Sequence, residues 1–137
     1  MFKPHTLEAL TAWNKNTAVE QLGIEFTDSG DNWLEARMPV DARTHQPMGL
    51  LHGGASVLLA ETLGSVAGNL CVQAGEACVG LEINANHLSS VREGWVYGRV
   101  EPLHIGRSTQ VWEIKIRRED QKLVCVSRLT LAVIQTP

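Results

Sequence analysis

The chain has 137 residues, of which 44% are hydrophobic and 20% charged, and its formal net charge is −3. That length is enough for one domain with a core that needs neither disulfides nor metal. Because nucleic-acid binding requires a basic field that this charge balance lacks, we predict a single domain, residues 1–137, that does not bind nucleic acid.

The cysteines and the N-terminal segment bear on the cellular setting. The chain has three cysteines, Cys71, Cys78 and Cys125. Because this number is odd and their spacing is not that of zinc ligands, we expect reduced thiols. Residues 1–13 contain no apolar signal-peptide core, and no stretch reaches about 18 uninterrupted apolar residues. We therefore expect a cytoplasmic protein without a membrane span and without a bound metal.

The first predicted element is a short amphipathic helix that Thr6 can cap. Its apolar residues recur at helical spacing: Leu7, Leu10 and Trp13. It should end near residues 15–16, and we interpret it as a lid or flank. A β-hairpin is expected next, with strands at 23–28 and 33–40 around the turn sequence Ser-Gly-Asp-Asn.

A polar loop over residues 41–48 leads to the central helix, predicted over residues 53–72. This helix is apolar on most sides, which is typical of a helix in a core. Glu61 is its one carboxylate, and a carboxylate carried into a core is costly unless it is paired, hydrogen-bonded or protonated. Catalysis is the best explanation for that cost.

Everything after the central helix is predicted to be sheet. Alternating apolar residues indicate the strands, which are expected at residues 79–86, 95–103, 109–118 and 123–134. In the third of these, Trp112, Ile114 and Ile116 share one face, and the last three strands should be linked by hairpins. One buried helix among five or six antiparallel strands predicts an α+β fold in which the sheet curls around the helix.

A loop and a helix together carry a specific motif. The segment from Gln46 to Gly54 reads Gln-Pro-Met-Gly-Leu-Leu-His-Gly-Gly, and Glu61 follows nine residues after His52. With further matches at residues 38–41, 60–65, 80–87 and 102–107, the sequence resembles the hot-dog-fold acyl-CoA thioesterases over nearly its whole length. Within that family it looks closest to bacterial 1,4-dihydroxy-2-naphthoyl-CoA hydrolases of menaquinone synthesis, with enterobactin-pathway proofreading thioesterases as near relatives.

The chemistry of the motif residues agrees with this resemblance. Gly53 opens the helix and leaves free backbone amides at its positive end, which suits an oxyanion hole. Glu61 can attack a thioester carbonyl or deprotonate a water that attacks it. Ser65 lies one turn beyond Glu61 and can orient the carboxylate, although it can also bond its own backbone. Gln46 and His52 flank the oxyanion amide and can hydrogen-bond the thioester oxygen.

One chain should not complete this site. Eight residues of helix separate Gly53 from Glu61, about 12 Å at the standard rise, so both cannot touch one carbon atom. A two-fold homodimer would let Gly53 of one chain face Glu61 of the other, and the resemblance implies the same arrangement. Gly54, Gly64 and Gly68 are expected near the Glu61 side of the helix, where they would admit substrate, partner or a packed neighbour.

The resemblance also implies where coenzyme A binds. The implied contacts lie at Gly80, at His87, Leu88, Ser89 and Ser90, and at His104, Ile105, Gly106, Arg107, Ser108 and Thr109. Arg107 and Arg92 are the candidate phosphate partners. Ser89 and Met48 stand where close relatives more often carry a basic residue and a phenylalanine.

We therefore expect a thioesterase that hydrolyses an aromatic acyl-CoA, most specifically 1,4-dihydroxy-2-naphthoyl-CoA, without metal or redox cofactor. The expected assembly is a homodimer that pairs into a dimer of dimers, a homotetramer. Three alternatives stay open: a thioesterase for carrier-protein or broad acyl-CoA substrates, a non-catalytic acyl-CoA-binding module, and a hot-dog hydratase. The hydratase would need an Asp and His pair, for which Asp41 and His45 have the wrong setting.

Overall fold

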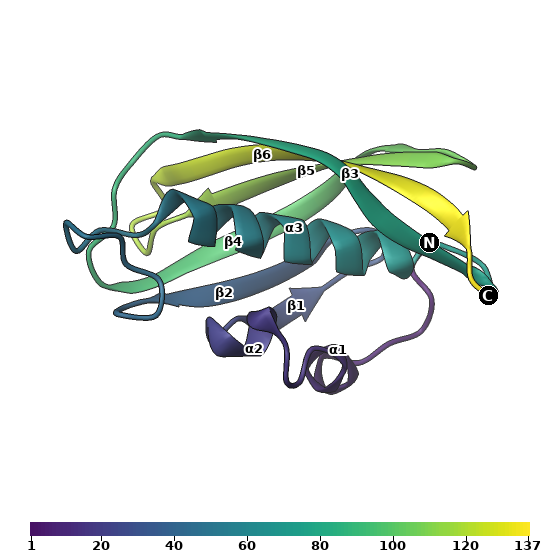
Figure 1. Ribbon diagram of the computed structural model, residues 1–137, viewed down its shortest axis with the longest axis horizontal. Coiled ribbons are helices and arrows are strands. Elements are labelled where there is room, and N and C mark those ends of the chain that lie inside the picture. The colour runs from purple at the N-terminus through teal and green to yellow at the C-terminus, as the bar shows by residue number, and fades with distance from the viewer.

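A computed structural model describes all residues, 1–137, as a six-stranded antiparallel sheet with one long helix packed against it (Figure 1). The helices are α1 (Leu7–Trp13), α2 (Ala18–Gln21) and α3 (Gly53–Asn69). The strands are β1 (Glu25–Ser29), β2 (Leu34–Val40), β3 (Glu76–His87), β4 (Gly94–Ile105), β5 (Thr109–Arg117) and β6 (Leu123–Gln135). The predicted α+β hot-dog architecture is therefore confirmed. No helix is long and apolar enough to cross a bilayer.

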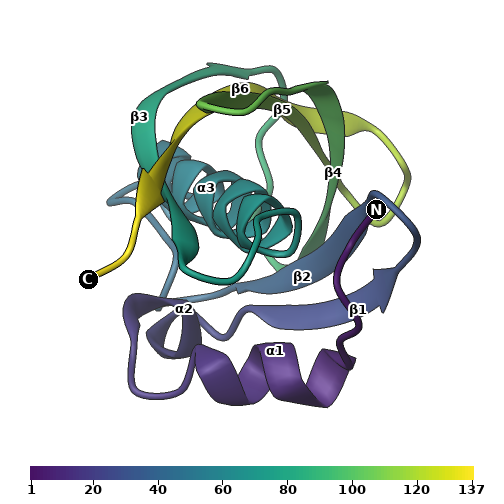
Figure 2. The ribbon, with the colours of Figure 1, turned by 90° about the vertical axis from the view of Figure 1, so that its right-hand side faces the viewer.

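The strands run in the order β1-β2-β4-β5-β6-β3, so β3 forms one edge of the sheet. As predicted, β4, β5 and β6 are consecutive hairpin-linked strands, whereas β3 crosses over to pair with β6. In Figure 2 the sheet curls over α3 from β3 round to β2. The side of the helix between β3 and α2 has no strand beside it. That open side decides which residues of α3 remain accessible.

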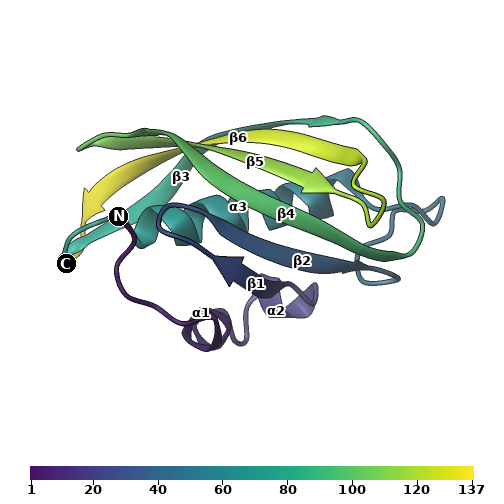
Figure 3. The same ribbon diagram turned by 180° about the vertical axis from the view of Figure 1, so that it is seen from behind.

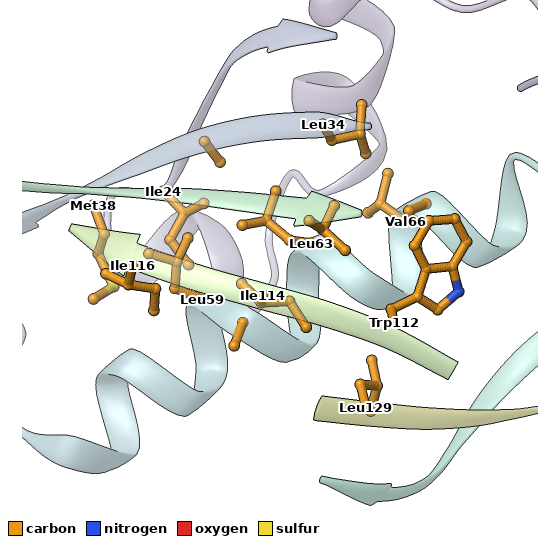
Figure 4. Packing of buried hydrophobic residues seen from close by; sticks show 14 of the residues in the cluster. Ile24, Leu34, Met38, Leu59, Leu63, Val66, Trp112, Ile114, Ile116 and Leu129 are labelled. Atoms are coloured by element: carbon orange, nitrogen blue, oxygen red, sulfur yellow. The ribbon is translucent and has the colours of Figure 1, made fainter. Parts of the chain in front are cut away.

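The core forms between α3 and the concave face of the sheet (Figure 4). The predicted alternation in β5 is confirmed, because Trp112, Ile114 and Ile116 are fully buried while Lys115 is exposed. Leu59 and Leu63 of α3 pack into the same core. Burial of such side chains stabilises the fold by about 1.5–3 kcal/mol each, which fixes α3 relative to the strands.

Glu61 is not carried into the core by its own chain, and here the sequence-based expectation was wrong. Buried residues occupy most of α3, but Gly54, Leu58, Glu61 and Ser65 recur every three to four positions on its less buried stripe. This stripe faces the side that the sheet leaves open, so the Glu61 carboxylate keeps access to solvent. No salt bridge in the chain involves it.

Two of the three glycines expected near the Glu61 side of α3 face away from the Glu61 stripe. A Cβ at Gly64 would lie 2.4 Å from Leu129, and one at Gly68 would lie 2.4 Å from Leu131. Both glycines therefore let α3 approach β6 closely, and the expected role in admitting substrate or partner is wrong for them. Of these three glycines, only Gly54 is exposed.

The two N-terminal helices lie together beside β1, as Figures 1 and 3 show. The Thr6 side chain accepts a hydrogen bond from the Ala9 amide, which confirms its predicted capping role. The second helix, α2, was not predicted, because four residues are too few to show a period. Its capping residue, Thr17, was the sequence feature that could have indicated this helix.

Candidate active site

His52 is the N-cap of α3. Its backbone is extended, and its Nδ1 accepts a hydrogen bond from the Gly54 amide at 2.8 Å. An Nδ1 atom that accepts cannot carry the hydrogen, so the neutral imidazole holds it on Nε2. His52 therefore presents an N–H donor on the exposed side of the helix start.

The cap leaves one particular backbone donor free. Because His52 takes the Gly54 amide, and the backbone hydrogen bonds of the chain give the Gly53 amide no acceptor, Gly53 is the unpaired N–H at the start of α3. The partial positive charge of a helix N-terminus adds to its attraction for an anion. The helix start can thus stabilise a developing oxyanion.

A cavity of about 410 Å³ opens beside Gly53, and we call it the oxyanion cavity. It is lined by Gln46, Leu50, Leu51, Gly53, Ser56, His87, Leu88, Ser89, Ser90 and Val124. The structure therefore brings Gln46 and the predicted 87–90 segment together at Gly53. The contact is close, because a Cβ on Gly53 would lie 3.0 Å from His87 Nε2.

The side chain of Gln46 is held by its own loop. Its Oε1 accepts hydrogen bonds from the Met48 and Leu50 amides, and its backbone N–H donates to the Leu50 carbonyl at 2.8 Å. The side-chain NH₂ group is left as the free donor. Gln46 thus presents a second donor toward the oxyanion cavity.

Glu61 lines a different cavity of about 420 Å³, which we call the glutamate cavity. It lies between α3 and the two N-terminal helices and is lined by Trp13, Asn14, Ala18, Val19, Leu58, Glu61, Thr62, Ser65, Val66 and Asn69. Ser65 shares it with Glu61, as its spacing predicted. The lining residues from α1 and α2 were missed by sequence reasoning, although Trp13 at the end of an amphipathic helix was a signal.

Gly80 of β3 packs directly against Glu61. A Cβ at this position would lie 2.6 Å from Glu61 Oε2, so only glycine lets the carboxylate reach the strand. The ladder between β3 and β6 shifts register between Gly80 and Glu82. Val79 and Leu81, predicted on the buried face, are exposed at this bulge, whereas Ile83 and Ala85 beyond it pack against the core as predicted.

The two cavities have no lining residue in common. The residues expected to act on one thioester are therefore divided within a single chain, as the helix-length argument predicted. The third predicted segment, His104 to Thr109, forms the β4–β5 turn and lines neither cavity. It lies at the Gly80 end of the sheet, because Thr109 pairs with Ala132, which pairs with Val79.

The candidate phosphate contacts differ in whether their polar groups already bind a partner within the chain. Arg92 and Arg107 are exposed and form no salt bridge, so both are available to an anion. The Ser89 hydroxyl donates to the Leu123 carbonyl of β6. The hydroxyl proton is therefore engaged within the chain. Ser89 helps to shape the oxyanion cavity but offers no free donor.

The hydratase alternative finds no support in the loop before α3. Arg43 hydrogen-bonds Asp41, which lowers the pKa of that carboxyl to about 2. The His45 ring contacts the Arg92 carbonyl at 2.8 Å through Nε2. Because a carboxylate with so low a pKa is a weak base, this pair does not suit acid–base catalysis.

Comparison with known proteins places this geometry in a family. The profile of the Thioesterase superfamily matches residues 48–125, more than half of the chain, including Gly53, Glu61 and Gly80. The chain belongs to the thioesterase superfamily. It is therefore a thioester hydrolase, and the fold and enzyme class expected from the sequence are confirmed.

Individual relatives cover almost the whole thioesterase. The chain is 57% identical to 1,4-dihydroxy-2-naphthoyl-CoA hydrolase of Escherichia coli, over 94% of this chain and 95% of that protein. It is 56% identical to proofreading thioesterase EntH of Cronobacter turicensis, over 98% of each. A crystal structure of a Haemophilus influenzae thioesterase is 58% identical and superposes with a TM-score of 0.95, covering 97% of this chain and 93% of the other.

Proposed function

We propose that this thioesterase hydrolyses an aromatic acyl-CoA, in the first instance 1,4-dihydroxy-2-naphthoyl-CoA, to the free acid and coenzyme A. The observation that carries the proposal is the position of Glu61, an unpaired carboxylate at an apolar-lined cavity next to Gly80. A relative that is 57% identical bears the name of this activity, which supports the choice of substrate.

In the proposed reaction, the thioester oxygen accepts a hydrogen bond from the Gly53 amide, and the His52 Nε2–H and the Gln46 side-chain NH₂ donate to the same oxygen. Glu61 acts in one of two ways. It takes a proton from water as the hydroxide adds to the carbonyl carbon, or its own oxygen adds to give a mixed anhydride that water then cleaves. In both cases the C–S bond breaks, and the coenzyme A thiolate leaves and is protonated. Ser65 orients the carboxylate.

We propose a homodimer formed through β3 as the catalytic unit. This edge strand is twelve residues long and exposes Val79 (44%) and Leu81 (60%), the kind of edge that pairs with another chain. A two-fold axis near Ile83 and Asn84 would set Gly80 opposite His87 of the partner subunit. Since Gly80 contacts Glu61 and His87 contacts Gly53, this register would join the glutamate cavity of one chain to the oxyanion cavity of the other.

The same register supports the predicted coenzyme A contacts. It would bring the β4–β5 turn, at the Gly80 end of one chain, toward the segment 87–90 of its partner. Arg107 and Arg92 would then approach a common phosphate region from two subunits. We further propose that two such dimers associate into a homotetramer.

A carrier-protein thioesterase is the second candidate, because EntH of Cronobacter turicensis, a proofreading thioesterase, is 56% identical. A panel of thioesters tests the choice. It contains three CoA esters, 1,4-dihydroxy-2-naphthoyl-CoA, benzoyl-CoA and palmitoyl-CoA, and carrier proteins that bear a benzoyl or a fatty-acyl group as a thioester. We expect kcat/KM to be highest for the aromatic CoA esters, about tenfold or more above palmitoyl-CoA. A carrier-protein thioester that outperforms them would favour the second candidate, and binding without hydrolysis would favour a non-catalytic module.

Two substitutions separate the donor role of His52 from its capping role. His52→Ala removes both the Nε2–H donor and the cap, whereas His52→Asn keeps an N-cap acceptor. We expect both variants to lose about 10- to 100-fold in kcat, because the Gly53 amide still polarises the carbonyl. Only His52→Ala should lower the melting temperature. If His52→Asn restores kcat, the imidazole acts through the helix cap and not as a donor.

A further inference from the structure

The glutamate cavity combines a carboxylate with an aromatic ring, and the oxyanion cavity has neither a carboxylate nor a tryptophan. Five of its ten lining residues are hydrophobic, namely Trp13, Ala18, Val19, Leu58 and Val66, and it has no Lys or Arg. The oxyanion cavity has four hydrophobic residues among its ten and carries Ser, His and Gln side chains but no carboxylate. An apolar cavity with a few polar groups at one place is the usual form of a small-molecule site. Here Glu61 is the only ionisable group among five polar lining residues.

Trp13 is the unusual member of this lining. It is 59% exposed, and its indole N–H has no hydrogen-bond partner in the chain. Trp112, in contrast, is fully buried and donates its indole N–H to Gln110 at 2.9 Å. A tryptophan left half in solvent beside a cavity is available to a ligand, and its flat face suits another aromatic ring.

The corner between α1 and α2 holds Trp13 in place. The Asn14 side chain donates to the Leu10 carbonyl at 2.8 Å, and the Thr17 hydroxyl donates to the Asn14 carbonyl at 2.5 Å. The same Thr17 oxygen caps α2 by accepting the Val19 amide at 3.2 Å. Asn16 adopts a φ of 61°, a left-handed conformation that Asn tolerates better than most residues. These contacts fix the backbone of the corner, and this backbone places the Trp13 and Val19 side chains in the lining of the cavity.

We propose that the glutamate cavity receives the acyl group of the substrate and that Trp13 selects planar aromatic acyl groups by stacking against them. This inference rests on the proposed function, since it places the acyl group of the same thioester. The carbonyl lies at Glu61, and the ring extends between Trp13 and the Val66 side of α3. The N-terminal helices, which contribute no predicted catalytic residue, thereby determine specificity.

Non-hydrolysable ligands test this proposal without relying on turnover. S-Phenacyl-CoA and S-acetonyl-CoA share the coenzyme and a carbonyl group. The carbonyl carbon bears a phenyl ring in the first ligand and a methyl group in the second. Calorimetry should give the wild type at least about tenfold tighter binding of the phenacyl ligand, and Trp13→Ala should remove most of that preference. Trp13→Phe should retain most of it.

Trp33→Ala is the matched control, because Trp33 lies in the β1–β2 hairpin and stacks on Arg99, away from the cavity. It should leave the preference unchanged. The proposal is overturned if Trp13→Ala keeps the wild-type preference, or if it weakens both ligands equally, as a purely structural role would. Failure of the proposed function looks different: the wild type would bind the phenacyl ligand at Trp13 yet hydrolyse no aromatic acyl-CoA.

Discussion

Replacing Glu61 by Gln is expected to lower kcat by about a thousandfold or more while the fold and the assembly survive. Glutamine keeps the volume and the approach to Gly80 but can neither take a proton from water nor add to a carbonyl. Because the Glu61 carboxylate forms no salt bridge and lies on the less buried stripe of α3, its replacement leaves no partner unpaired. Activity is thus lost without loss of stability.

Steady-state kinetics with an aromatic acyl-CoA and a thermal melt measure the two effects separately. Glu8→Gln serves as the control, since Glu8 is an exposed carboxylate in the first turn of α1. We expect this control to retain wild-type kcat. A Glu61→Gln enzyme that keeps a tenth of the wild-type rate would place catalysis on another residue.

Gly53→Val should reduce kcat by about 100- to 1,000-fold, the usual cost of losing an oxyanion donor. A Cβ added at this position would lie 3.0 Å from the His87 ring, and the two methyl groups of valine would crowd the space in front of the amide. Gly53→Ala should be much milder, because the exposed His87 side chain can move aside. Equal losses in the two variants would show that access to the amide is not what valine removes.

Most of the fold could be predicted because strand alternation and helix capping depend on residues that are close together in the sequence. Alternation in β5 put Trp112, Ile114 and Ile116 on the buried face, and Thr6 marked the start of α1. The burial of Glu61 could not be predicted this way. The composition of α3 shows that the helix is mostly enclosed, but the order of strands in the sheet decides which of its sides stays open.

The arrangement of the site was predictable only in part for the same reason. The spacing of Gly53 and Glu61 along one helix predicted that a single chain would separate them, and they line separate cavities. The bulge after Gly80 and the participation of Trp13 depend on contacts between distant segments. The isolated glycine in β3 and the aromatic residue at the end of α1 were the only local signs of either.

A subunit-mixing experiment tests the central claim, that Gly53 of one chain and Glu61 of another form each site. Gly53→Val and Glu61→Gln homodimers should each be nearly inactive. When the two are unfolded together and refolded, one site of each heterodimer collects both substitutions and the other collects neither. With random pairing about half of the dimers are mixed, so roughly a quarter of wild-type activity should return. Heterodimers that are verified by mass and remain inactive would contradict the shared site.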